Sequence, residues 1–283
     1  MPSTTPTVGQ KTLRRTWRAA RLLLAGYLTL ILVAMWFENR LIFYPFAYPA
    51  GNWQPVDLPV EDAWFKTPDG TQLHGWYLPH PNAQATVLFC HGNAGNVTHR
   101  AIAMAMLHQQ AKVSVLVFDY RGFGRSQGKP NGENILADAR AARRWLAERE
   151  KVAERDIVIL GESIGGAVAV DLAARDGARA LILESTFDSL PEVAAYHYPW
   201  LPVRWAMRTR LDSAALIGQY HGPVFQAHGA VDTLVPLANA RRLFDAAQQP
   251  KQFLLLGNHN HNNLMPAEYY DALAAFIEKA VKP

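Results

Sequence analysis

The sequence predicts an α/β fold, with a mostly parallel, eight-stranded sheet that is covered by helices on both faces. From residue 61 onward, short runs of β-branched and aliphatic residues alternate with helical patterns of about 11 to 16 residues. The runs are apolar almost throughout, which is typical of parallel strands buried on both faces. In one stretch, residues 157–170, such a run ends in a sharp turn and a helix of small residues follows. Loops at the carboxyl ends of such strands carry the functional site.

The net charge of +4 is concentrated at the N-terminus. Residues 1–21 carry five basic residues and no acid, which leaves 23 basic and 24 acidic residues in the rest of the chain. A neutral body argues against a nucleic-acid partner, because phosphate binding needs a basic face on the fold itself. The single cysteine, Cys90, excludes an intramolecular disulfide and any multi-cysteine metal site. We expect no metal and no cofactor.

Residues 1–18 form a basic N-terminal arm, and residues 19–38 form a candidate transmembrane anchor. Residues 22–37 are 16 uncharged, mainly apolar residues, which makes about 24 Å of helix against a hydrocarbon core of ~30 Å. Two alternatives are a cleaved signal peptide, although no small-x-small site ends the run, and a soluble amphipathic or buried helix. The preceding basic residues predict a single-pass membrane protein with a cytoplasmic N-terminus and its body on the extracytoplasmic side.

Residues 39–60 contain four prolines and many aromatic residues, which predicts a stiff, extended connector that packs on the body. The body, residues 61–283, is expected to open with an antiparallel hairpin around Pro68, Asp69 and Gly70. Its strands are predicted at residues 63–66, 73–78, 86–90, 114–118, 157–161, 180–183, 224–227 and 252–256. Its helices are predicted at residues 98–110, 133–148, 164–176, 238–247 and 267–281.

The region from about residue 186 to residue 222 interrupts this alternation. It contains no clear strand but several aromatic residues, and a structureless loop of this length is uncommon in a compact domain. We therefore expect a small helical cap above the turn at residue 163.

Ser163 is the candidate nucleophile. It stands alone at the sharp turn between the predicted strand and helix, and Gly161 and Gly165 remove side chains where the two elements approach most closely. A serine hydroxyl is a poor nucleophile at its free pKa, so it needs a base within hydrogen-bond reach and a third group that orients the base.

The acid and the base are expected after later strands. Asp232 follows the strand at residues 224–227, and Glu184, at the end of an earlier strand, is the alternative acid. The loop after the strand at residues 252–256 contains two histidines, His259 and His261. Either histidine suits a general base at this position.

Two backbone N–H groups are expected to bind the oxyanion of the tetrahedral intermediate. Ile164 directly follows the nucleophile at a helix N-terminus, where the helix dipole favours negative charge. The second donor is Asn93, in the loop after the strand at residues 86–90, where Gly92 and Gly95 allow a tight turn. This loop matches neither a P-loop nor a dinucleotide-binding fingerprint.

These motifs together resemble the α/β-hydrolase-fold serine hydrolases, in particular the membrane-anchored ABHD-type group that includes eukaryotic acyl-protein depalmitoylases and bacterial members. The resemblance runs from about Leu41 to the C-terminus. It rests on His91-Gly92-Asn93-Ala94-Gly95-Asn96, Asp119-Tyr120-Arg121-Gly122-Phe123-Gly124, Gly161-Glu162-Ser163-Ile164-Gly165-Gly166, and His228-Gly229 with Asp232 and Val235-Pro236.

The resemblance implies a triad of Ser163, Asp232 and a histidine that acts through an acyl-enzyme. In this group the base is commonly followed by Asn and Asp and then by a helix that carries tyrosine. His261, Asn262 and Asn263 with Tyr269 and Tyr270 match that pattern better than His259 does, except that Asn263 replaces the Asp. The cysteine-rich N-terminus of the eukaryotic depalmitoylases is missing, and the apolar span stands in its place.

We therefore predict a membrane-anchored serine hydrolase of carboxylic esters or thioesters, with Ser163, Asp232 and His261 as the triad. The expected substrate is a small or lipid-like acyl ester. One alternative is an aminopeptidase or amidase with the same triad, and another is a catalytically silent hydrolase-fold binding protein. The intact serine, acid, histidine and both loop glycines argue against a silent scaffold, because a scaffold has no need of all of them together.

Overall fold

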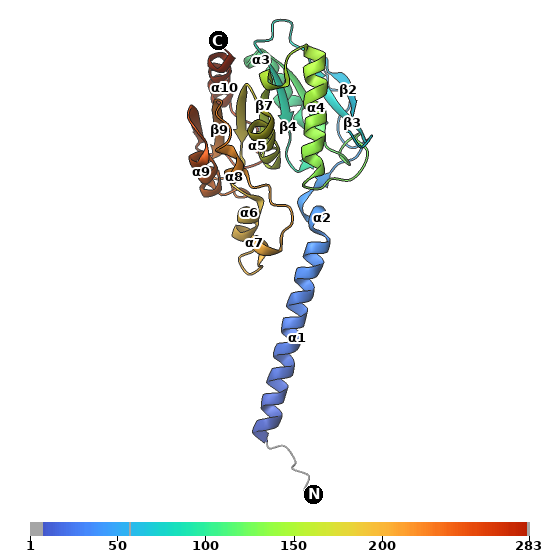
Figure 1. The fold of residues 1–283 in the computed structure, drawn as a ribbon, viewed down its shortest axis with the longest axis vertical. Helices are drawn as coiled ribbons and strands as arrows, with labels where there is room; N and C mark the ends of the chain where they lie inside the picture. The colour runs from blue at the N-terminus through green and yellow to red at the C-terminus, as the bar shows by residue number, and fades with distance from the viewer. Residues whose placement is uncertain (1–7, 57, 282–283) are drawn as a thin grey trace.

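A mixed sheet forms the centre of the protein in a computed structural model, which describes residues 8–56 and 58–281. Its strands are β2 (Glu61–Lys66), β3 (Gln72–Leu78), β4 (Ala85–Cys90), β6 (Val113–Asp119), β7 (Val158–Glu162), β8 (Ala180–Glu184), β9 (Val224–Gly229) and β10 (Lys251–Leu256). The order is β10-β9-β8-β7-β4-β6-β3-β2 (Figure 1). The strands from β10 to β6 are parallel, and β3 is antiparallel to both β6 and β2. The predicted eight-stranded sheet, with its opening hairpin, is confirmed.

Helices cover both faces of this sheet. On one face, α3 (Ala101–Gln110) and α10 (Ala267–Val281) pack on one apolar cluster. On the other face, α4 (Asn134–Glu150), α5 (Ile164–Asp176), α8 (Ser213–Ile217) and α9 (Leu237–Ala246) pack on a second cluster. The central strands contribute to both clusters because alternate side chains point to opposite faces. Two short 3₁₀ helices, η1 (Val97–Arg100) and η2 (Glu154–Asp156), complete the connections.

The segment between β8 and β9, where a cap is predicted, contains three short helices. Of these, α6 (Leu190–His197) and α7 (Val203–Ala206) project from the body toward the N-terminal helix, as Figure 1 shows. The third, α8, packs through Ile217 on the same cluster as α5 and therefore belongs to the main body. We define the cap as the part that contains α6 and α7, residues 186–210.

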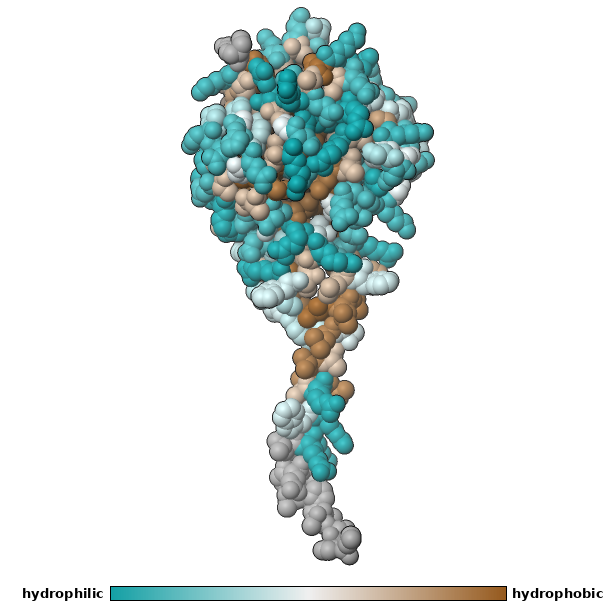
Figure 2. Space-filling model, in the orientation of Figure 1, coloured by the Kyte–Doolittle hydropathy of each residue, from teal (hydrophilic) through white to brown (hydrophobic). Residues whose placement is uncertain are grey.

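The N-terminal helix α1 (Val8–Trp36) extends away from the body (Figure 1). It covers residues 19–36 of the predicted anchor, which was expected to reach residue 38, and it includes the described part of the predicted basic arm; residues 1–7 lie outside the described residues. The segment Arg14–Trp36 is long and apolar enough to cross a membrane. Figure 2 shows hydrophobic residues gathered on the part of α1 nearest the body.

The connector after α1 packs on the body, as its apolar residues predict. It begins with the short helix α2 (Glu38–Ile42), so it is not extended from its first residue. Ile42 and Phe43 are buried in the cluster beneath α4 and α5. The two-residue strand β1 (Tyr44–Pro45) then pairs in parallel with β5 (Ala94–Gly95). The connector therefore reaches the loop after β4, where the sequence predicts an oxyanion donor.

Candidate active site

Ser163 lies in the turn between β7 and α5 with a φ of +53°. A positive φ at a non-glycine residue costs about 1–3 kcal/mol and persists only where the surroundings enforce it. The Ser163 N–H donates to the carbonyl of Glu184 (2.9 Å), and the Ser163 carbonyl accepts from the Gly166 N–H (2.9 Å). The Thr186 hydroxyl also donates to that carbonyl (2.7 Å). These three hydrogen bonds hold the turn, and the serine side chain projects from its apex.

The glycines on either side of Ser163 are required by close packing. A Cβ atom on Gly161 would lie 2.4 Å from the carbonyl oxygen of Gly165. A Cβ atom on Gly165 would lie 2.0 Å from the carbonyl oxygen of Cys90. The close approach of strand and helix that the sequence predicts is therefore present at both positions.

His261, in the loop after β10, lies between Ser163 and Asp232. Its Nε2 is 3.0 Å from the Ser163 Oγ, and its Nδ1 is 2.8 Å from the Asp232 Oδ2. An ionised carboxylate only accepts hydrogen bonds, so the Nδ1–H donates to Asp232 and Nε2 can accept from the serine hydroxyl. The three residues follow β7, β9 and β10, whose carboxyl ends share one edge of the sheet.

Asp232 is held in its ionised form by its neighbours. Its Oδ1 accepts from the N–H groups of Leu234 (2.9 Å) and Val235 (2.8 Å). Burial by itself would raise the pKa of Asp232, but the hydrogen bond and charge of His261 and the Val235 N–H outweigh it, so the pKa is lowered. The carboxylate can therefore orient His261 and stabilise its protonated form.

The alternative base, His259, lies in the same loop as His261 but packs against the end of β9. Its carbonyl packs on Gly229 so closely that a Cβ atom there would lie 2.0 Å away. Its Nε2 is buried and has no hydrogen-bond partner among the residues that the structure describes, and burial lowers its pKa. The histidine that lies within hydrogen-bond distance of both Ser163 and Asp232 is His261.

The alternative acid, Glu184, is buried at the end of β8. Its carboxyl group accepts a short hydrogen bond from the Tyr269 hydroxyl. Burial raises the pKa of Glu184 to about 8, so the carboxyl is protonated at neutral pH. A neutral group paired with tyrosine does not provide the negative charge that a histidine orienter needs.

Asn93 and Ile164, the predicted oxyanion donors, line the same cavity as Ser163. Ile164 is the first residue of α5, where backbone N–H groups have no partner within the helix. The Asn93 carbonyl accepts from the Tyr44 N–H (2.8 Å), and its side-chain amide donates to the carbonyl of Ile42 (2.7 Å). The connector therefore fixes the backbone of the loop that carries Asn93.

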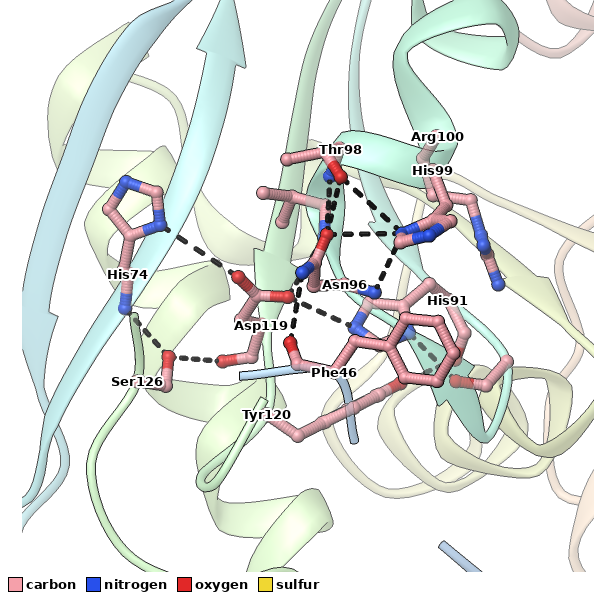
Figure 3. Close-up of polar contacts among 12 residues, drawn as sticks. Phe46, His74, His91, Asn96, Thr98, His99, Arg100, Asp119, Tyr120 and Ser126 are labelled. Atoms are coloured by element: carbon pink, nitrogen blue, oxygen red, sulfur yellow. Dashed lines mark hydrogen bonds and ion pairs between the residues drawn. The ribbon is translucent and has the colours of Figure 1, made fainter. Parts of the chain in front are cut away.

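Behind this loop lies a buried polar network around Asp119, the last residue of β6 (Figure 3). The Asp119 Oδ1 accepts from the Val97 N–H (2.9 Å) and lies 3.8 Å from the Nε2 of His91. The Oδ2 lies 3.9 Å from the Nδ1 of His74. Burial raises the pKa of Asp119, and the neighbouring His74 opposes this effect. The network connects the loop after β4 to the hairpin on the far side of β6.

His91 shapes this loop and does not contact Ser163. Its Nδ1–H donates to the carbonyl of Gly92 (2.7 Å), and the Tyr120 hydroxyl donates to the His91 carbonyl (3.2 Å). Burial lowers the pKa of His91 to about 3, so the ring is neutral at neutral pH. Next to it, Arg100 binds the carboxylate of Glu162 through two hydrogen bonds of 2.7 and 3.1 Å. This ion pair fixes the residue immediately before Ser163.

Ser163 lines a cavity of about 510 Å³ whose other lining side chains are mainly apolar. Volumes of this size are usual for small-molecule sites. Its walls come from the cap, from the loop after β9 and from the C-terminal end of α1. No group of three His, Cys, Asp or Glu residues within 8–56 and 58–281 is arranged to hold a metal ion.

Sequence reasoning does not identify two features of the site. One is Asp119, although an acid at the end of a mainly apolar strand is a signal for a buried carboxylate. The other is the contribution of α1 to the cavity, because its apolar run indicates only a membrane segment. The apolar residues of the connector indicate packing on the body but not its location.

Several known proteins are similar to this chain. Residues 85–250 match the family model described as alpha/beta hydrolase fold. An uncharacterized protein of Mycobacterium tuberculosis is 41% identical over 228 residues, covering 80% of this chain and 81% of the relative. The alpha/beta hydrolase domain-containing protein WAV2 of Arabidopsis thaliana is 30% identical and covers 86% of this chain and 88% of its own length.

Two further proteins are similar over most of the chain. An uncharacterized membrane protein of Saccharomyces cerevisiae is 27% identical and covers 92% of this chain and 97% of its own length. Among solved structures, an esterase from Pyrococcus furiosus superposes with a TM-score of 0.68 and 22% identity, covering 84% of this chain and 100% of the esterase.

Proposed function

Because this chain belongs to the α/β-hydrolase fold family, we propose that it is a serine hydrolase that cleaves carboxylic esters or thioesters through an acyl-enzyme on Ser163. The observation that carries the proposal is the pair of contacts made by His261, 3.0 Å from the Ser163 Oγ and 2.8 Å from the Asp232 Oδ2. The fold similarity to the Pyrococcus furiosus esterase supports the same class of reaction.

In the proposed reaction, the Ser163 Oγ attacks the carbonyl carbon of the substrate while Nε2 of His261 takes the hydroxyl proton. The tetrahedral intermediate collapses, the ester bond breaks, and the leaving alcohol or thiol takes that proton from His261. A water molecule then attacks the acyl-enzyme while His261 takes its proton; the bond between the acyl carbon and the Ser163 Oγ breaks, His261 returns the proton to Oγ, and the acid product leaves. Asp232 keeps the imidazole in the tautomer that both steps need.

The oxyanion of each intermediate is proposed to bind the backbone N–H groups of Ile164 and Asn93. The N-terminus of α5 adds the positive end of its dipole at the point where negative charge develops. Donors fixed before the reaction stabilise the transition state without reorganising, and the two hydrogen bonds between Asn93 and the connector support that rigidity.

We further propose that α1 anchors the enzyme in a membrane, with its N-terminus in the cytoplasm and the catalytic body on the other side. The length and composition of the segment Arg14–Trp36, the basic residues ahead of its apolar part, and the similarity to a yeast membrane protein support this. A C-terminal alkaline phosphatase fusion tests the orientation, because the phosphatase is active only outside the cytoplasm. If the phosphatase fusion is inactive and a separate C-terminal GFP fusion is fluorescent, the body lies in the cytoplasm and the proposed orientation is wrong.

The test of the hydrolase is covalent labelling of the purified full-length chain with a fluorophosphonate probe. We expect wild-type protein to be labelled and Ser163→Ala to be unlabelled, and the variant should lose about 10⁴-fold or more in the turnover of a p-nitrophenyl ester. Equal labelling of the two proteins would reject Ser163 as the nucleophile. The same preparation distinguishes the alternatives. An amidase would cleave aminoacyl p-nitroanilides, whereas a silent binding protein would cleave neither these amides nor the p-nitrophenyl ester.

A further inference from the structure

The C-terminal end of α1 forms part of the wall of the cavity that contains Ser163. Ile31, Ala34 and Met35 of α1 line this cavity, as does Glu38, the first residue of α2. The spacing of three and four residues puts Ile31, Ala34 and Met35 on one face of α1. Val33, on the opposite face, is exposed. One face of the proposed membrane anchor is therefore continuous with the binding site.

Hydrogen bonds at both ends of this face attach α1 to the cap. Toward the N-terminus, the Tyr27 hydroxyl donates to the carbonyl of Trp200 (2.7 Å). At the other end, the buried carboxylate of Glu38 accepts from the N–H groups of Arg208 (3.0 Å) and Thr209 (2.6 Å). The Arg208 guanidinium also donates to the carbonyl of Met35 (2.6 Å). The cap and α1 thus enclose the cavity between them.

The contact at Tyr27 indicates how far the cap reaches along the anchor. Tyr27 precedes Trp36, the last residue of α1, by nine residues, which is about 13 Å along a helix axis. In a hydrocarbon core of ~30 Å this is almost one leaflet. With Trp36 at the membrane interface, the rim of the cap would therefore reach the depth of the acyl chains of the leaflet on the side of the body.

The cap carries exposed aromatic side chains that suit the membrane interface, together with the exposed ion pair of Arg204 and Glu192. Tyr196, Tyr198, Trp200 and Trp205 are all exposed, and Trp205 is 90% exposed. Tyrosine and tryptophan are enriched where proteins meet the membrane interface. In water these rings would form an unfavourable apolar surface, whereas in a bilayer they contact lipid.

We propose that the substrate is a lipid with a long-chain acyl ester, which enters from the bilayer between α1 and the cap, and that α1 is one wall of its acyl-binding site. This inference rests on the proposed hydrolase function and adds the source of the substrate to it. The acyl chain passes from the leaflet along Ile31, Ala34 and Met35 and brings its ester carbon to Ser163. The reaction is the hydrolysis described above, with water as the only co-reactant.

The experiment compares two substrates with two matched variants of the full-length chain in phosphatidylcholine vesicles. The long substrate is p-nitrophenyl palmitate dissolved in the bilayer, and the short one is p-nitrophenyl acetate in the aqueous phase. Ala34→Trp fills the wall of the cavity, and Val33→Trp adds the same ring to the lipid-facing side of α1. We expect Ala34→Trp to lower the ratio of long-chain to short-chain kcat/KM about tenfold or more, because an apolar pocket loses binding with each excluded methylene.

Val33→Trp should leave both kcat/KM values within about twofold of wild type, as is usual for a substitution on an exposed surface. Ile31→Trp, on the same face as Ala34, should lower the ratio of long-chain to short-chain kcat/KM in the same way. Agreement of the two variants would show that the effect comes from filling the acyl-binding site and not from a local distortion at residue 34. If the ratio of long-chain to short-chain kcat/KM is unchanged in both Ala34→Trp and Ile31→Trp, the inference is wrong. Hydrolysis of p-nitrophenyl acetate in the same experiment would still support the proposed function. If the wild-type protein hydrolyses neither substrate and is not labelled by the fluorophosphonate probe, the proposed hydrolase function is itself wrong.

Discussion

The turn that carries Ser163 and the cap with α1 form two ends of one cavity, and they are held in different ways. Ser163 is 7% exposed, and backbone hydrogen bonds and glycine packing fix its turn. The cap has exposed aromatic side chains and is attached to α1 by a few hydrogen bonds near Tyr27 and Glu38. The turn that carries Ser163 is therefore fixed within the core. The position of the cap, by contrast, depends on a small number of contacts with α1.

This difference fits the demands on each end. Reacting groups lose rate steeply when displaced by about 1 Å, so they benefit from a rigid support. An acyl chain is bound by non-directional apolar contact, which a less constrained wall can provide. Substitutions in the turn should therefore have large, specific effects, and substitutions between the cap and α1 should have small ones.

The largest effect should come from the histidine that contacts Ser163. We expect His261→Ala to lower kcat for p-nitrophenyl acetate by about 10⁴-fold or more, because the serine loses its base and the leaving group its acid. His259→Ala is the matched control from the same loop, and its loss should be smaller by at least about 100-fold. A greater loss in His259→Ala would transfer the role of base to that residue.

The next effect concerns the packing beneath the turn. Gly161→Ala puts a Cβ atom 2.4 Å from the backbone oxygen of Gly165, and overpacking of this kind should lower the free energy of unfolding by about 3 kcal/mol. Gly257→Ala is the control, since no atom lies within 4 Å of its added Cβ, and it should change stability by less than about 0.5 kcal/mol. Denaturant unfolding of the full-length chain measures both, and similar values would refute the close-packed turn.

The third prediction concerns pH and the buried carboxyl group of Glu184. Its pKa of about 8 lies above the ordinary value of 4.5, so the folded protein binds one more proton than the unfolded chain between these values. The contribution of Glu184 to the free energy of unfolding should therefore be highest below about pH 4.5. It should fall as the pH rises toward 8, by at most about 1.4 kcal/mol per pH unit.

Glu184→Gln should remove that part of the pH dependence, because the amide is neutral at every pH and still accepts from the Tyr269 hydroxyl. Thermal unfolding of both proteins between pH 5 and about 8.5 measures the difference in slope. The backbone carbonyl of Glu184, which accepts from the Ser163 N–H, is unchanged. Equal slopes would mean that the carboxyl group is ionised within the fold.

The two ends of the cavity also differ in how far the sequence predicts them. The turn at Ser163 is a local pattern, and its glycines could be assigned because strand, turn and helix are adjacent in the chain. The positions of the strands and their mostly parallel arrangement were predicted from the alternation of apolar runs with helical patterns, and the family resemblance is confirmed by the matching family model. The roles of Asp232 and His261 remain predictions, although the structure brings both side chains to Ser163.

The wall formed by α1 could not be predicted in this way. The Glu38 carboxylate and the Thr209 N–H are 171 residues apart in the chain, and no periodic pattern connects residues at such a separation. An apolar run also has the same composition whether it faces lipid or a substrate. The network around Asp119 is similar, since His74 lies in β3 and His91 in the loop after β4, and both approach Asp119 only in the folded sheet.

The smallest effect should come from the contact between α1 and the cap. Tyr27→Phe removes only the hydroxyl that donates to the Trp200 carbonyl, and a hydrogen bond of this kind in a membrane contributes on average about 0.6 kcal/mol. For a chain of this size that corresponds to a decrease in Tm of about 1–3 °C, which differential scanning calorimetry in bilayers can resolve. Turnover of p-nitrophenyl acetate should stay within about twofold, because the turn at Ser163 is supported independently of the cap. A loss of more than about 3 kcal/mol would show that the cap and α1 are as rigidly joined as the catalytic turn, and the contrast between the two ends of the cavity would no longer hold.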